Sequence, residues 1–290
     1  MDLTIIIPNH NDLRMIKMIE SIDYRSTKNQ TVELLILLNN PTKEVIRQCN
    51  EIKIRFKKDF LVREILTDIQ NLGYLYNLGI KNASFEHIMF LDSDLICGNN
   101  SIELMVSQLK KNKVELIKAK LIYTNMNGLV EKARLVNTTE KVPPYIPVIL
   151  LKKSIFFKFK DNFLFAIDVV WCSDAEFAHR VINENIPYIY SEAEFFHDKI
   201  SLKKDIKDAF LYGFGKGIRV KRTREKWEPF NEIISMRRKG KKCGLTLREN
   251  SYSVFWITMQ QLACLIQQFI PPVFTNSLDF RNSTKREEIS

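Results

Sequence analysis

The stretch His87-Ile88-Met89-Phe90-Leu91-Asp92-Ser93-Asp94 decides the fold of this chain. Its first five residues form a largely apolar run that predicts a buried strand, and two carboxylates separated by one residue follow directly. Ligands of open α/β sheets bind at the carboxyl ends of the strands. Carboxylate oxygens suit Mg²⁺ and Mn²⁺. The stretch therefore predicts a sheet with a metal site at this edge, although Asp-x-Asp alone also fits a solvated turn or a helix start.

Strand-like and helix-like segments alternate on both sides of this stretch. Apolar runs that end at turn residues predict strands, and Asn11 or Asp12, Thr42 and Asn99 stand where helices would begin. Near-continuous apolar strands joined by helical crossovers predict a mostly parallel sheet covered on both faces. The expected strands are 3–7, 32–38, 60–66, 87–91 and 114–123, and the expected helices are 12–21, 42–52, 72–82 and 99–111.

The second half of the chain gives weaker signals. We expect irregular structure over 125–145, a strand over 146–151, an aromatic loop over 161–171, a helix over 174–183 and a short strand over 187–190. The chain becomes helical from Leu202, and 282–290 has the composition of a frayed tail.

Charge is concentrated near the C-terminus. The 290 residues carry a net charge of +10, and residues 201–249 hold 15 Lys/Arg against 6 Asp/Glu. Residues 250–278 that follow contain no charged side chain but many large apolar ones. Basic followed by apolar sequence is typical of contact with an anionic membrane surface.

The apolar segment 251–274 admits three interpretations. Gln260, Gln261, Gln267 and Gln268 fall in pairs seven residues apart, which places them on one helical face and argues against a membrane span. This pattern suits a helix that lies in the membrane interface, while a packed helix with a polar stripe, including a homodimer contact, is the alternative.

The five cysteines are scattered, with no zinc spacing and no disulfide framework. We interpret them as reduced thiols of a cytoplasmic protein, with no signal peptide before the strand at Leu3.

The order of motifs resembles the inverting family-2 glycosyltransferases of the GT-A fold over roughly residues 2–220. The matching segments are Ile5-Ile6-Ile7-Pro8-Asn9-His10-Asn11, Asn39-Asn40-Pro41-Thr42, Asn71-Leu72-Gly73 with Asn77-Leu78-Gly79, Phe90-Leu91-Asp92-Ser93-Asp94, Trp171-Cys172-Ser173-Asp174-Ala175-Glu176 with Arg180, and Tyr212-Gly213-Phe214-Gly215-Lys216-Gly217. The last is similar to a segment of members that build bacterial surface polysaccharides. Two departures stand out. The position of the family's base-binding carboxylate falls near Leu38 or Asn39, and Ser173 replaces the first acid of the Glu-Asp pair.

The resemblance implies a Rossmann-like, three-layer α/β/α catalytic domain over 1–200, with a nucleotide-sugar half over about 1–98 and an acceptor half over about 99–200. A basic and apolar helical extension would follow over 201–281. It also implies which residues bind the nucleotide sugar: Pro8, Asn9, Asn11, Asn39, Asn71, Gly73, Asp92 and Ser93.

For the metal, Mn²⁺ or Mg²⁺, the resemblance implies direct contact by Asp94. Asp92 would contact ribose, or the metal through water. His197, which follows a predicted strand, is a candidate third ligand or diphosphate donor, or an ordinary structural histidine. The metal would act as Lewis acid on the leaving diphosphate.

Asp174 is the candidate general base, because it begins a helix after an aromatic loop and partial burial would raise its pKa. The alternative is an N-cap that only binds backbone N–H groups, with Glu176 and Arg180 as an ordinary pair four residues apart. Glu176 is the second candidate base, or an acceptor-binding group.

We therefore expect a metal-dependent, inverting glycosyltransferase that uses a UDP-sugar and extends a glycan or lipid-linked acceptor on the inner face of the cell membrane. A peptide or protein acceptor is the alternative. A nucleotidyltransferase would need a Gly-rich phosphate loop after the first strand, and Pro8-Asn9-His10-Asn11 offers none. A non-enzymatic membrane- or nucleic-acid-binding protein would leave the carboxylates without a shared site, and we expect no specific nucleic-acid partner.

Overall fold

The computed structural model of the protein describes residues 1–124, 127–134, 136, 143–159, 165–169 and 171–270. Its strands are β1 (Leu3–Asn9), β2 (Val32–Asn39), β3 (Leu61–Thr67), β4 (His87–Phe90), β5 (Leu95–Cys97), β6 (Leu116–Tyr123), β7 (Ile149–Lys152) and β8 (Tyr188–His197). They form one sheet in the order β3-β2-β1-β4-β7-β6-β8-β5. The helices are α1 (Met15–Glu20), α2 (Lys43–Arg55), α3 (Leu72–Asn82), α4 (Ser101–Asn112), α5 (Leu129–Arg134), α6 (Ser173–Asn183), α7 (Leu202–Thr223), α8 (Pro229–Lys242) and α9 (Leu247–Phe269).

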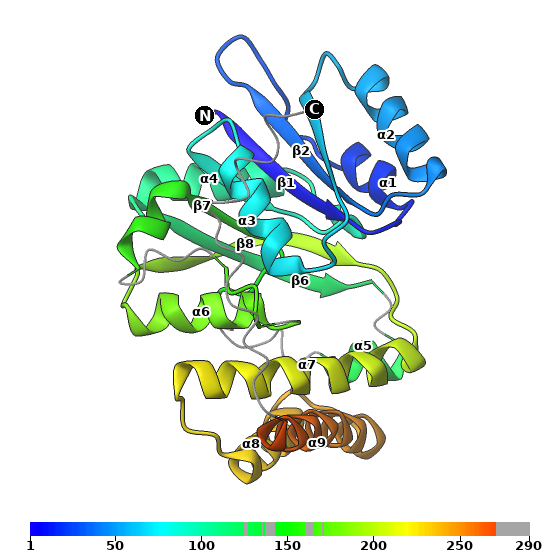
Figure 1. Cartoon of the computed structure of the whole chain (residues 1–290), viewed down its shortest axis with the longest axis vertical. Coiled ribbons are helices and arrows are strands. Elements are labelled where there is room, and N and C mark those ends of the chain that lie inside the picture. The colour runs from blue at the N-terminus through cyan, green and yellow to red at the C-terminus, as the bar shows by residue number, and fades with distance from the viewer. Residues whose placement is uncertain (125–126, 135, 137–142, 160–164, 170, 271–290) are drawn as a thin grey trace.

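The side chains of β1 face two different cores, because successive residues of a strand point to opposite sides of the sheet. Ile5 and Ile7 belong to the core that the sheet forms with α1, α2 and α4. Ile6 belongs to the core that it forms with α3 and α6. Both cores are apolar and fully enclosed, so β1 needs no polar face. The predicted α/β/α layering is thereby confirmed (Figure 1).

The sheet changes direction at β7. β3, β2, β1 and β4 are parallel neighbours, whereas β7 runs antiparallel to both β4 and β6. Ile149 at the start of β7 pairs with Lys118 and Leu151 with Leu116, and such an antiparallel pair needs no crossover connection. β8 is parallel to β6 and antiparallel to β5. The parallel part of the expected sheet is thus its first half, and the sheet as a whole is mixed.

Three elements differ from the sequence expectation. The strand expected over 187–190 continues to His197, because Ala193 and Phe195 are buried while Glu192 and Glu194 point outward, and this second half pairs with β6 and β5. β5 has only three residues and gives no periodic pattern. α5 lies within the segment expected to be irregular. The expected tail 282–290 and residues 161–164 and 170 of the expected aromatic loop lie outside the described residues.

The C-terminal helices form a layer beside the sheet domain, with α7 next to it and α8 and α9 beyond (Figure 1). α9 packs closely on α7 at two glycines. A Cβ atom on Gly213 would stand 2.6 Å from the Cβ of Ala263, and one on Gly217 would stand 2.6 Å from the Cβ of Gln267. Real side chains do not approach so closely, so only glycine permits this helix contact.

The glutamine face of α9 points inward rather than toward a membrane interface. Gln261 and Gln267 are buried, and Gln261 accepts a hydrogen bond from Trp227 Nε1 at 2.8 Å. The outer side of α9 carries exposed apolar side chains instead, namely Phe255, Leu262, Leu265, Ile266, Phe269 and Ile270. Within the described ranges, no helix combines the length and the hydropathy that a membrane crossing requires.

Candidate active site

Asp92, Ser93 and Asp94 form the turn between β4 and β5. Leu91 N–H donates to the carbonyl of Ile6 at 3.1 Å, which continues the parallel pairing of β4 with β1. The turn therefore lies at the carboxyl end of the sheet, as the sequence predicted. Ser93 is buried in the turn.

His197 reaches this turn through strand register. It is the partner of Leu95 in the antiparallel pair of β5 and β8, so it lies beside the residue that follows Asp94. Its Nε2 is 3.4 Å from Asp94 Oδ2. Its Nδ1 lies 2.6 Å from the backbone carbonyl of Asp198. Since a carbonyl only accepts, Nδ1 donates to it, and this orientation leaves Nε2 as the ring nitrogen that faces Asp94 and could bind a metal.

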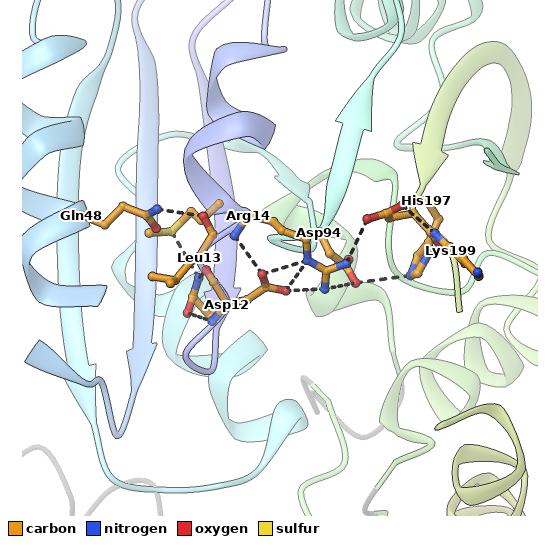
Figure 2. A network of polar contacts seen from close by, with 10 residues as sticks. Asp12, Leu13, Arg14, Gln48, Asp94, His197 and Lys199 are labelled. Carbon is orange, nitrogen blue, oxygen red and sulfur yellow. Dashed lines mark hydrogen bonds and ion pairs between the residues drawn. The ribbon is translucent and has the colours of Figure 1, made fainter. Parts of the chain in front are cut away.

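Arg14 lies on the other side of Asp94 (Figure 2). Its Nη2 is 3.1 Å from Asp94 Oδ2 and 2.6 Å from Asp12 Oδ2, and its Nε donates to Asp12 Oδ1 at 3.0 Å. The hydrogen bond to Asp12 and the nearby carboxylates raise the pKa of Arg14, against the effect of burial. One arginine thus links the loop after β1 to the Asp92–Asp94 turn. The sequence analysis did not identify it.

A cleft of about 460 Å³ opens at this edge of the sheet. β4, β6 and β8 contribute residues at or near their ends, and α7 forms the opposite wall. The lining side chains are Asp92, Asp94, Leu121, Tyr123, Arg134, Pro147, Trp171, His197, Ile200, Lys204, Lys207, Asp208, Leu211 and Tyr212. The cleft therefore combines three carboxylates, an imidazole and several cations with aromatic walls.

Asp92 and Asp174 share one electrostatic environment. Burial, together with the charges of Asp94 and Asp174, raises the pKa of Asp92 to about 7. Burial also raises the pKa of Asp174 to about 6, although a hydrogen bond from Ala175 N–H at 2.8 Å opposes the rise. Two carboxylates that disfavour each other's charge near neutral pH are typical of acid–base sites.

Lys118 is a second residue that the sequence analysis missed. It lies in β6, is buried, and donates from Nζ to the carbonyl of Pro147 at 2.6 Å. Burial lowers its pKa to about 7, while the charges of Asp174 and Asp92 act in the opposite direction. β6 also carries Lys120, which is exposed, so the sequence alone does not single out Lys118.

The comparison with protein families decides the identity of this fold. The model of glycosyl transferase family 2 matches residues 4–174, which is more than half of the chain. The chain belongs to glycosyltransferase family 2. A curated relative from Rickettsia felis, described as an uncharacterized glycosyltransferase, is 32% identical over 111 residues. That match covers 38% of this chain and 17% of the relative, so the chain spans less than a fifth of the relative's length.

Solved structures of glycosyltransferases share the fold. The mannosyltransferase PcManGT from Pyrobaculum calidifontis, in complex with GDP-Man and Mn²⁺, aligns with a TM-score of 0.57 over 93% of this chain and 76% of its own, at 13% identity. TarS 1-349 of S. aureus in complex with UDP-GlcNAc aligns with a TM-score of 0.56 over 92% and 84%, at 11% identity. The resemblance to this family and fold is confirmed.

The expected nucleotide-binding residues organise the loops at the strand ends. Pro8 is buried within β1, and Asn9 is buried and joined to Asp12 by hydrogen bonds in both directions, at 2.8 and 3.1 Å. Asn11 accepts from Thr42 N–H at 2.7 Å, which ties the loop after β1 to the loop after β2. Asn39 is buried, with its Oδ1 3.2 Å from His10 Nδ1.

Asn71 and Gly73 hold the chain that leads into α6. Asn71 caps α3 and donates to the carbonyl of Ile167 at 2.6 Å. A Cβ atom on Gly73 would stand 2.7 Å from the carbonyl of Ala166. Asn77 makes two hydrogen bonds with the backbone of Phe165, at 2.9 and 2.7 Å. These contacts position the start of α6, and with it Asp174.

Glu176 lies away from the cleft. It is buried and forms an ion pair of 2.8 Å with Arg180 Nε, whose guanidinium stands 4.5 Å from the ring of Phe159. Neither Glu176 nor Asp174 is among the residues that line the cleft, but only the charge of Asp174 acts on the lining residue Asp92. The two acids of α6 thus differ in surroundings: Asp174 shares the electrostatics of Asp92, and Glu176 is engaged within the helix.

Proposed function

We propose that the protein transfers a sugar, with inversion, from a nucleoside-diphosphate sugar to an acceptor hydroxyl, with Asp174 as base and Asp94 and His197 at a metal site. The observation that carries the proposal is that Asp92, Asp94 and His197 line one cleft, while the charge of Asp174, which is not itself a lining residue, acts on Asp92. Family membership favours transfer of a sugar over transfer of a nucleotide, and an enzyme over a non-enzymatic protein.

Asp94 and His197 fit a divalent ion. Neighbouring ligands of an octahedral ion with bonds of about 2.1 Å lie roughly 3.0 Å apart, and Asp94 Oδ2 and His197 Nε2 are separated by 3.4 Å. Among the described residues, no group of three or more His, Cys, Asp or Glu side chains is arranged to hold a metal alone. Mg²⁺ and similar ions often take the remaining ligands from substrate phosphates and water. When bound, Mn²⁺ or Mg²⁺ would supply positive charge for the leaving diphosphate.

Asp174 would take the proton of the acceptor hydroxyl. The acceptor oxygen then bonds to the anomeric carbon from the side opposite the diphosphate, and the bond from that carbon to the diphosphate oxygen breaks with its electron pair. A pKa of about 6 leaves Asp174 ionised at neutral pH yet still basic enough to accept a proton. Trp171, which lines the cleft three residues earlier, would shield this exchange from water.

A UDP-sugar is our proposed donor, bound along Asn9, Asn39, Asp92 and Ser93. Structural neighbours bind either UDP-GlcNAc or GDP-Man, so the test is a screen of UDP-, GDP-, dTDP- and CMP-sugars with and without Mn²⁺. We expect thermal stabilisation and slow nucleotide release with one nucleotide class, dependent on metal and lost in Asp94→Ala. No response to any donor by folded protein would contradict the proposal.

The acceptor is proposed to be a glycan or a lipid-linked sugar at the inner face of the cell membrane. The exposed apolar side of α9, beside the basic helix α8, supports contact with anionic lipid. We expect the protein to sediment with vesicles that contain phosphatidylglycerol but not with pure phosphatidylcholine vesicles, and Leu262→Glu/Ile266→Glu to abolish this binding. The wild type could instead form a homodimer in solution and bind no vesicles, with the same variant monomeric. That result would show that the apolar side of α9 contacts a second copy of the chain and not a membrane.

A peptide or protein acceptor remains the second candidate. Lys204, Lys207 and Asp208 line the cleft beside Tyr123 and Tyr212, a mixed polar and aromatic wall that suits sugar or peptide groups. Transfer of labelled sugar to bacterial lipid extract, compared with transfer to soluble protein extract, separates the two acceptors.

A further inference from the structure

The guanidinium of Arg14 contacts the same oxygen of Asp94 that the proposed metal ion would use. Asp94 Oδ2 lies 3.1 Å from Arg14 Nη2 and 3.4 Å from His197 Nε2, so both the arginine and the proposed metal would use the same oxygen (Figure 2). Asp198 Oδ2 is 3.8 Å from Arg14 Nη1, which adds a third carboxylate around the guanidinium. The positive charge of Arg14 therefore already balances the proposed metal site.

Asp12 anchors Arg14 independently of Asp94. Asp12 binds both Nε and Nη2 of the guanidinium and accepts from the backbone N–H of Arg14 at 2.9 Å. This two-point geometry holds the guanidinium itself, with Nη2 shared between Asp12 and Asp94. The contact with Asp94 is a single bond at the outer end, and the Arg14 side chain is 41% exposed. The guanidinium can thus leave Asp94 while it stays bound to Asp12.

We infer that Arg14 is a resident counter-cation that makes metal binding at Asp94 conditional on the diphosphate. The inference rests on the metal site of the proposed function. Without donor, a divalent ion must displace Arg14 from Asp94 and then suffers repulsion from it at short range. With donor, the two phosphates supply negative charge that Arg14 binds in place of Asp94, since guanidinium and phosphate form strong paired hydrogen bonds. Arg14 therefore opposes the metal alone and favours the metal together with diphosphate.

The test measures Mn²⁺ binding by the loss of the free-ion EPR signal, with Mn²⁺ alone and with the nucleoside diphosphate selected by the donor screen. We expect Arg14→Gln to bind Mn²⁺ alone at least tenfold more tightly than the wild type, and to lose at least tenfold in binding of the nucleoside diphosphate. Asp94→Asn/Arg14→Gln should bind Mn²⁺ alone no better than Asp94→Asn. Arg25→Gln is the matched control. Arg25 is 37% exposed and pairs with Asp59 at a distance of 2.8 Å, and neither residue lines the cleft.

The outcomes separate the inference from the function on which it rests. Unchanged Mn²⁺ affinity in Arg14→Gln, with nucleotide-dependent Mn²⁺ binding in the wild type, would overturn the role of Arg14 and leave the metal site standing. Absence of Mn²⁺ binding by the wild type and by Arg14→Gln, both with and without nucleotide, would overturn the metal site as well. Tighter Mn²⁺ binding in Arg25→Gln would show a general effect of net charge and would also overturn the inference.

Discussion

Leu95 and His197 are register partners in the pair of β5 and β8, and this pairing brings His197 Nε2 to 3.4 Å from Asp94 Oδ2. A histidine 103 positions later in the chain is thus held at the Asp92–Asp94 turn by strand geometry rather than by a local motif. His197→Ala should weaken the Mn²⁺-dependent binding of the nucleotide by at least about tenfold. This is the lower end of the loss in affinity that substitutions around a metal site cause.

The measurement is titration with the nucleotide at fixed Mn²⁺, followed by thermal shift. His179→Ala is the control, because His179 is similarly shielded but lies 3.4 Å from Glu225, outside the cleft lining. Equal affinities of the two variants would remove His197 from the metal site.

The elevated pKa of Asp174 predicts a pH dependence of activity. A base must be unprotonated, so kcat/KM should fall as the pH drops through about 6, the value to which burial raises the pKa of Asp174. Because Asp92 titrates near 7 and is coupled to Asp174, the acid limb belongs to the pair. Asp174→Asn should lose transfer and retain donor binding. Full donor binding with undiminished turnover in this variant would exclude Asp174 as the base.

The same shift predicts a stability effect of opposite sign to that of a salt-bridged acid. The folded pKa of Asp174 is raised above 3.8, so the folded state holds the proton more tightly and its stability declines as the pH rises from about 4 to about 6. In EDTA, the stability gained by Asp174→Asn should be larger at pH 8 than at pH 5 by about 1 kcal/mol, since one pKa unit corresponds to roughly that amount. Urea unfolding at both pH values measures it, and an equal gain at both would contradict the shifted pKa.

Glu33 predicts an acid-sensitive point in the sheet domain. Its side chain is fully buried in β2 and accepts from Thr4 Oγ1 at 2.6 Å, Ser84 N at 2.8 Å and Arg63 Nη1 at 2.7 Å. Burial opposes ionisation, but these hydrogen bonds together lower the pKa of Glu33. Its stabilisation is therefore present above the ordinary pKa near 4.5 and is lost as the pH falls through the lower folded value.

Glu33→Gln should cost about 2–4 kcal/mol at pH 7, because it leaves Arg63 without its buried partner. The cost should shrink below pH 4. Urea unfolding measures both, with the exposed Glu51→Gln as the control. A cost that is independent of pH would show that packing, rather than charge, is what Glu33 contributes.

The glycines of α7 predict a sharp size limit at the contact with α9. Gly217→Val places a side chain where Gln267 already stands, so α9 must shift. We expect destabilisation of about 1–3 kcal/mol, typical of overpacking, and a smaller loss for Gly217→Ala. Lys203→Ala, at an exposed position of the same helix, should change stability by less than about 0.5 kcal/mol. Chemical unfolding of the three variants measures the ordering, and a tolerated Gly217→Val would refute close packing here.

The elements that the sequence predicted are those with a local signal. The apolar runs of β1, β2 and β4 and the carboxylates after Phe90 could be recognised because burial and strand ends leave patterns within a few residues. β5 is too short for any pattern and exists because β8 pairs with it. The glutamines of α9 follow the same logic. Their spacing showed that they share a face but not what that face would meet.

The candidate site follows the same division. Asp92, Asp94 and Asp174 carry motif signals, whereas Arg14 acquires its importance only from a contact 80 residues away. Lys118 shows its role only once β6 and the chain at Pro147 are side by side. Charged side chains that tertiary contacts bring together follow no periodic pattern in the sequence. Sequence patterns therefore cannot assign their role.

α7 separates two surfaces that lie back to back. Lys204, Lys207 and Leu211 face the cleft, while Gly213 and Gly217 fit against α9. Asp205 locks the pair further, because it accepts a hydrogen bond from Tyr252 of α9 at 2.6 Å and pairs with Arg134. Two stacked helices, each about 10 Å across, therefore set a fixed height between the outer side of α9 and the reacting centre. An acceptor attached to a surface that α9 contacts would have to extend on the order of 20 Å from that surface to reach the reacting centre. The two helices would thus select acceptors by length.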